Sequence, residues 1–213
     1  MGPLSPNSTY LLLDAATPTT QVGLLHEGAF TAFSSTDEAP LASLFTQAQS
    51  LMKEHNLGLE SLSGLIYCQG PGSILGVRLT LMAIRTWKRT HPHLQCYTYN
   101  SLALGSALVS ENHTSEAFTF IAPGRQQRWH TLNNSQQKEI PADALGSLTG
   151  PIYTLPQRKK SFCLPTDTHI IDYDLASHAK LFSKEGLLTL TDAPETFNQT
   201  EATYKTWKPD RHR

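Results

Sequence analysis

The stretch "QGPGSILGVRLT", residues 69–80, decides the fold class of this 213-residue chain. An apolar pattern typical of a buried strand, "LSGLIYCQ" at 62–69, leads into it, and an apolar, arginine-bearing pattern leaves it without a break. A glycine-rich turn between a strand and a helix offers backbone N–H groups and the positive end of the helix dipole to an anion. The same turn also needs glycine for its geometry, so phosphate binding and a purely structural turn are both open.

The loop matches none of the standard phosphate or nucleophile signatures. No Lys-Ser/Thr pair follows the glycines, as a P-loop requires, and the spacing is not GxGxxG. Gly70 and Gly72 would permit close approach of a phosphate, and the hydroxyl of Ser73 could donate to it. Ser73 lies outside any GxSxG elbow, so the sequence predicts no serine nucleophile here.

Strand and helix patterns alternate on both sides of this loop. In chain order, we expect strands at 10–14, 21–28 and 29–35, a helix at 40–55, the strand at 62–69, a helix at 74–90, a strand at 95–99 and a helix from Asn100 or Ser101 onward. Pro40 suits the first turn of the first helix, and Gly58 follows its end. Strands that alternate with helices after an opening meander predict a mixed α/β sheet.

The pattern of predicted strands and helices changes after residue 112. The second half predicts two strands around a Pro-Gly turn at 117–132, a short helix at 141–148, a short strand at 150–155 and a helix at 175–186, followed by a polar tail. We therefore expect a leader at 1–9, a first lobe at 10–112 and a smaller second lobe at 113–213.

Composition excludes several classes of protein. The net charge is −1, so the chain has no electrostatic signature of autonomous nucleic-acid binding. Cys68, Cys96 and Cys163 are widely spaced, and the close histidine pair at 91 and 93 has no metal-binding pattern around it. No window approaches the roughly 18 apolar residues of a membrane span, and no secretory signal opens the chain. These features predict a soluble cytoplasmic protein without a metal.

Two segments together resemble a known family. "YLLLDAATPTTQVGLL" at 10–25 and "LSGLIYCQGPGSILGVRLT" at 62–80 resemble the TsaB (YeaZ) family, and the likeness covers about residues 10–110. Members of this family are bacterial partners in making threonylcarbamoyladenosine on tRNA and are relatives of the TsaD/Kae1 proteins. The resemblance implies an actin-like ATPase (ASKHA, ribonuclease H-like) fold with two lobes, the second small and divergent.

The resemblance places Asp14, Thr17, Gly70, Gly72 and Ser73 in two phosphate-facing loops. The chain departs from the family pattern with Ala15-Ala16 after the aspartate, with Ile74-Leu75 after Ser73, and with Pro123-Gly124-Arg125 where Asp-Ala-Arg is usual. It also lacks the family's His-Ser pair at the start of the first helix. Each departure removes a hydroxyl, carboxylate or imidazole, so we expect no catalytic residue and no required cofactor. Weak ATP or ADP binding is left open.

The resemblance further implies a scaffold that pairs with a TsaD-like catalytic subunit through the helices at 40–55 and 74–90. The expected contact residues are Leu44, Phe45, Leu51, Arg78, Met82, Arg85 and Trp87, although the same residues would also suit a core. A TsaE-like ATPase would join the complex, tRNA would reach the chain only through it, and the chain alone would form a homodimer. The alternative is a small actin-like ATPase or phosphotransferase that uses Asp14 and the 70–73 loop.

Overall fold

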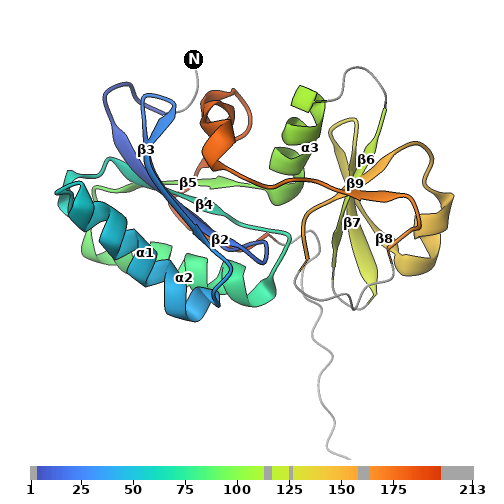
Figure 1. Ribbon diagram of the computed structural model, residues 1–213, viewed down its shortest axis with the longest axis horizontal. Coiled ribbons are helices and arrows are strands. Elements are labelled where there is room, and N and C mark those ends of the chain that lie inside the picture. Colours follow the sequence, from blue (N-terminus) through green and yellow to red (C-terminus); the bar gives the residue numbers. More distant parts are fainter. Residues whose placement is uncertain (1–3, 113–116, 125–126, 158–163, 198–213) are drawn as a thin grey trace, which may run out of the picture.

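The chain forms two β-sheets that lie side by side (Figure 1). A computed structural model describes residues 4–112, 117–124, 127–157 and 164–197. The first sheet has the order β11 (Thr189–Leu190), β5 (Gln95–Tyr99), β4 (Gly64–Cys68), β1 (Thr9–Asp14), β2 (Thr20–His26) and β3 (Ala29–Thr36). The second has the order β10 (Thr168–Ile170), β9 (Ile152–Thr154), β6 (Thr119–Pro123), β7 (Arg128–Asn133) and β8 (Gln136–Pro141).

Helices cover both faces of the first sheet. Helices α1 (Pro40–Glu54) and α2 (Ile74–Thr90) pack on one face, and α3 (Ser101–Asn112) lies on the other, between the two sheets (Figure 1). Strand β1 is buried on both sides because successive side chains alternate. Leu11 and Leu13 join the core beneath α1 and α2, whereas Tyr10 and Leu12 join the core beneath α3.

The second sheet also buries both of its faces. Phe120 packs toward α3, where Gly105 leaves room for its ring. Ile121 and Trp129 point to the opposite face, under the 3-10 helix η2 (Ala142–Ser147). Alternate residues of β6 therefore belong to different cores, as a strand with period two requires.

The elements expected in the first half are confirmed. The opening meander is present, β1 runs parallel to β4, and β4 runs parallel to β5. Helix α2 begins at Ile74 and ends at Thr90, as the spacing predicts. Asn100 caps α3, since its side-chain oxygen accepts from the amides of Leu102 (2.8 Å) and Ala103 (3.4 Å).

The second half differs more from expectation. Strands β8, β10 and β11 were not anticipated, and the helix expected at 175–186 is a 3-10 helix, η3 (Ala176–Ser183), with non-helical angles at His178. A further 3-10 turn, η1 (Leu59–Ser61), links α1 to β4. The short helix expected at 141–148 is also of the 3-10 type.

The end of the described chain returns to the first sheet. Strand β11 pairs with β5, and η3 packs near β3, so this part of the expected second lobe (113–213) lies against the first. We call residues 191–197 the strap. Its amides bond to the carbonyls of Cys96 and Gln69, at 2.8 Å each, through Thr191 and Phe197. The boundary expected at 112/113 borders 113–116, which are outside the described residues, as are 1–3 of the leader.

No helix in the described ranges is long and apolar enough to cross a membrane. Cys68 and Cys96 are free, buried thiols, and Cys163 lies outside the described residues. Cys68 belongs to the core beneath α3, as its apolar surroundings in the sequence indicate.

Candidate functional site

The turn after β1 and the loop after β4 lie directly against each other. The backbone N–H of Ser73 donates to the carbonyl of Ala16 at 2.7 Å. On the far side of the loop, the N–H of Ser101 donates to the carbonyl of Gly70 at 3.1 Å, and the Ser101 hydroxyl donates to the carbonyl of Pro71. The loop is therefore held from both sides by protein groups.

The glycines of the loop serve this close contact between backbones. A Cβ built at Gly72 or Gly76 would lie under 3.0 Å from the carbonyl oxygens of Ala16 and Ala15, respectively. Gly70 has a φ of 97°, which favours glycine on conformational grounds alone. The glycine pattern is thus explained by packing and turn geometry, without a phosphate.

The N-terminus of α2 is capped by the chain itself. The Ser73 side-chain oxygen accepts from the amide of Gly76 at 3.2 Å, which satisfies one of the first free donors of the helix. Ile74 and Leu75, the two residues after Ser73, are 57% and 61% exposed. The first turn of α2 therefore offers solvent an apolar surface next to the cap.

The carboxylate of Asp14 points into the protein and is fully buried. One oxygen, Oδ1, accepts from the amide of Ala16 at 2.7 Å. The other, Oδ2, accepts from the hydroxyls of Tyr99 at 2.5 Å and Tyr173 at 2.7 Å. Both oxygens are occupied by protein donors, so Asp14 is not presented to a ligand.

Tyr173 belongs to a segment that crosses back from the second sheet to the first. Gln21 on β2, itself buried, fixes this crossing by donating to the Tyr173 carbonyl at 2.8 Å and accepting from the Leu175 amide at 2.9 Å. The side-chain amide of Gln21 thus serves as the hydrogen-bond partner of two backbone groups, the Tyr173 carbonyl and the Leu175 amide. The crossing segment thereby holds the Tyr173 hydroxyl against the Asp14 carboxylate.

Burial determines the acid–base properties of this cluster. It raises the pKa of the Asp14 carboxyl, opposed by the hydrogen bonds from Tyr99, Ala16 and Tyr173. Burial, and then the neighbouring Asp14 charge, raise the pKa values of both tyrosine hydroxyls well above their usual range. The pKa of the Cys68 thiol is also raised well above normal by burial, so it stays protonated and is a poor nucleophile.

We predict a pH signature for Asp14. Because its folded-state pKa is raised above the unfolded value of about 3.9, the folded protein binds this proton more tightly than the unfolded chain. The resulting stabilisation is full below about pH 4 and is lost as pH rises through the folded-state pKa. Asp14→Asn removes this titration, so the wild type should lose stability relative to the variant over that window.

Urea unfolding of both proteins at a series of pH values measures this difference. Asp172→Asn, which makes the same substitution at an exposed position beside Tyr173, is the matched control. A difference in the free energy of unfolding between wild type and Asp14→Asn that stays constant with pH would contradict the prediction.

The other expected site residues contribute no open ligand group. The hydroxyl of Thr17 is directed to the carbonyl of Thr19 at 3.1 Å. Pro123 is the last residue of β6, the amide of Gly124 donates to the carbonyl of Arg128 at 2.8 Å, and Arg125 lies outside the described residues. Within the described ranges, no group of three His, Cys, Asp or Glu side chains could hold a metal ion.

The expected contact residues on α1 and α2 divide into two sets. Leu44 and Leu51 are in the core, 0% and 7% exposed, so their assignment to an interface is corrected: they face the sheet. Phe45, Met82, Arg78 and Arg85 are exposed, and Trp87 is half-buried, with its ring edge-on to Phe45 at 5.9 Å between centroids.

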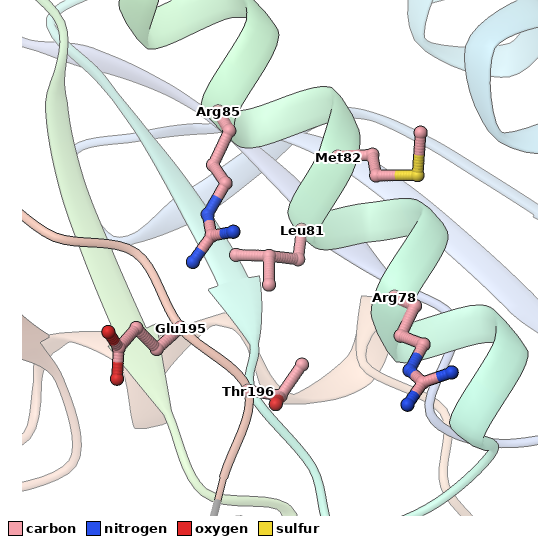
Figure 2. A pocket seen from close by; sticks show the side chains of 6 residues that line it. All are labelled: Arg78, Leu81, Met82, Arg85, Glu195 and Thr196. Carbon is pink, nitrogen blue, oxygen red and sulfur yellow. The ribbon is translucent and has the colours of Figure 1, made fainter.

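A shallow groove of about 430 Å³ lies between α2 and the strap (Figure 2). It is lined by Arg78, Leu81, Met82, Arg85, Glu195 and Thr196. Figure 2 shows Arg85 and Leu81 extending toward the strap, whereas Met82 points to the other side of the helix. The Nε of Arg85 donates to the carbonyl of Pro194 at 2.9 Å, which fixes the guanidinium at the edge of the groove.

The strap is anchored at this groove by Tyr67. The Tyr67 hydroxyl accepts from the amide of Glu195 at 3.0 Å and donates to its carbonyl at 3.1 Å. Sequence analysis missed Gln21, Tyr67, Tyr99 and Tyr173 as site residues. No short-range signal could have found them, because each of these side chains bonds to a partner that lies 85 to 159 positions away in the chain.

The two sheets, with helices on both faces of the first, form a mixed α/β fold of the actin-like ATPase class. Among solved structures, the chain is similar to YeaZ from Pseudomonas aeruginosa, with 18% identity, a TM-score of 0.56, and coverage of 70% of this chain and 75% of that one. It is equally similar, at 17% identity and a TM-score of 0.56, to an uncharacterized protein described as similar to peptidase YeaZ from Pseudomonas aeruginosa, covering 76% and 84% of the two chains. No family model and no curated protein matches the sequence. The resemblance to TsaB (YeaZ) is thus confirmed at the level of the fold.

Proposed function

We propose that this chain is a non-catalytic subunit of the TsaB (YeaZ) type, which pairs with a TsaD-like catalytic subunit in the modification of tRNA to threonylcarbamoyladenosine. The shared fold and the resemblance of the 10–25 and 62–80 segments support this proposal. A TsaE-like ATPase would join the complex in the cytoplasm. tRNA would reach the chain only through the complex, because the chain's own net charge of −1 offers nucleic acid little attraction.

One observation carries the proposal: exposed apolar side chains gather on one pair of helices. In the described part of the chain, five of the seven large exposed hydrophobic residues lie on α1 and α2: Leu41, Phe45, Ile74, Leu75 and Met82. The two helices pack beside each other on the same face of the sheet (Figure 1). Exposed apolar side chains that gather on neighbouring elements are typical of sites of protein association.

The buried state of Asp14 supports a role without catalysis. An ATPase would need this carboxylate, or a metal on it, to face the nucleotide, but both oxygens accept from protein donors. The loop at 70–73 is likewise occupied by its own contacts. These contacts favour the scaffold over the alternative of an ATPase, and we propose that the chain uses no nucleotide of its own.

Co-purification with the TsaD-like protein of the same genome, sized by light scattering, tests the proposal. The wild type should form a heterodimer with and without ATP. Phe45→Asp and Met82→Asp should each weaken it about 100-fold, because each places a charge in a desolvated apolar contact. Ile170→Asp is the matched control, since it adds the same charge at a residue 61% exposed on β10.

Circular dichroism and thermal unfolding should show that all three variants remain folded. A wild-type chain that forms no heterodimer under either nucleotide condition would rule the proposal out. Equal loss of binding in Ile170→Asp would show that the α1–α2 face is not the contact.

A further inference from the structure

The exposed face of α2 carries charge of a single sign. Its sequence holds Arg78, Arg85, Lys88 and Arg89 and no acidic residue. No ion pair between described residues involves any of these four side chains, and Lys88 turns toward the carbonyls that follow the helix. Arg78 and Arg85 lie four and three residues from Met82 along the helix, so this exposed methionine lies between two guanidinium groups that form no ion pair within the described ranges.

One of these groups is already fixed in position. The bond from Arg85 Nε to the carbonyl of Pro194 holds the guanidinium beside the groove, with its terminal nitrogens unused by any hydrogen bond of the described residues. An immobilised guanidinium loses less conformational entropy when it pairs with a carboxylate, and it presents a planar fork for two bonds. The groove is therefore preorganised for an acidic group.

A second copy of this chain fits the face poorly. In a two-fold dimer the same patch meets itself. If Met82 lies near the axis of two antiparallel α2 helices, Arg78 of one copy comes near Arg85 of the other. Like charges brought together at an interface oppose association. The face thus discriminates against the homodimer expected from the resemblance.

We propose that this face binds an acidic partner segment: an apolar side chain enters beside Met82, and two carboxylates pair with Arg78 and Arg85. The two arginines are seven residues apart, which is about 10 Å along a helix, so the carboxylates are spaced similarly. This inference rests on the proposed function and adds the chemistry of the partner surface.

An RNA strand is the less suitable occupant. The groove has Leu81 in its wall and Met82 at its rim, and neither apolar side chain offers a hydrogen-bond donor to a phosphate. None of the described residues that line the groove is aromatic, so none of them offers a ring on which a base could stack. A protein surface that carries carboxylates beside apolar side chains can pair with the two arginines and also pack against Leu81 and Met82.

The test measures the affinity of the TsaD-like protein for charge variants at 50 and 500 mM salt. Arg78→Glu/Arg85→Glu should weaken binding about 100-fold at low salt, and Arg78→Gln/Arg85→Gln about 10-fold. The difference in affinity between the two double variants should shrink at high salt, because salt screens charges and leaves apolar contacts unaffected. Lys138→Glu, an exposed cation on β8, is the matched control and should bind as the wild type does.

The outcomes separate this inference from the proposed function. Wild-type affinity in both arginine variants, together with loss of binding in Met82→Asp, would overturn the acidic partner and leave the subunit role intact. No heterodimer with the wild-type chain would overturn both. A wild-type homodimer that Met82→Asp dissociates, or binding of bulk tRNA that is lost in the arginine variants while the heterodimer persists, would also overturn the inference.

Discussion

Gly76→Ala is expected to lower the free energy of unfolding by about 2–3 kcal/mol, even though alanine is the better helix former by roughly 1 kcal/mol. The added Cβ would lie 2.9 Å from the carbonyl carbon of Ala15 and closer still to its oxygen. Both atoms are backbone, so α2 must move away from the turn after β1. Such a shift also strains the bond from Ser73 to Ala16.

Chemical and thermal unfolding measure this effect, and a loss of this size in a chain of this length lowers Tm by roughly 4–12 °C. Gly146→Ala is the control, because a Cβ there meets nothing within 4 Å. It should leave stability within about 0.5 kcal/mol of the wild type. Equal stability of the two variants would show that the loop does not depend on close backbone contact.

Asp14→Ala is expected to cost about 3 kcal/mol or more. The substitution leaves the Ala16 amide and the hydroxyls of Tyr99 and Tyr173 without their acceptor, and each unsatisfied buried donor costs roughly 1–3 kcal/mol. Loss of the desolvated carboxylate offsets part of this cost. The crossing segment that carries Tyr173 should become more accessible to hydrogen exchange.

A triple variant distinguishes orphaned donors from general disruption. Asp14→Ala combined with Tyr99→Phe and Tyr173→Phe removes two of the three unsatisfied donors and should recover part of the lost stability. Asp172→Ala, on the exposed neighbour of Tyr173, should be close to neutral. If the triple variant is less stable than Asp14→Ala, the hydroxyls are not the source of the cost.

Most of the first lobe could be predicted because its signals are local. Apolar runs of strand length and the glycines that follow β4 lie within a few residues of the elements they define, and α2 begins where they indicate. In the second half, β10 and β11 have only 3 and 2 residues, so no periodicity marks them. They exist because neighbouring strands accept their hydrogen bonds.

The candidate site shows the same division. Leu44 and Phe45 are adjacent and equally apolar, but Leu44 is 0% exposed and Phe45 43%. When the apolar stripe of a helix is wide enough to include both residues, the sequence does not show which of the two side chains faces the sheet. The strap and the Tyr173 crossing likewise cover α2 and Asp14 from more than 100 positions away in the chain.

By itself, the sequence determined the order of strands and helices in the first lobe, the fold class, and the loops in which Asp14 and Gly70 would lie. Only the tertiary structure decided that these loops are closed, that Leu44 and Leu51 are core, and that Arg85 is fixed beside an open groove. The reason is physical: local propensities act over a few residues, whereas burial and hydrogen-bond partners depend on segments that meet only after folding.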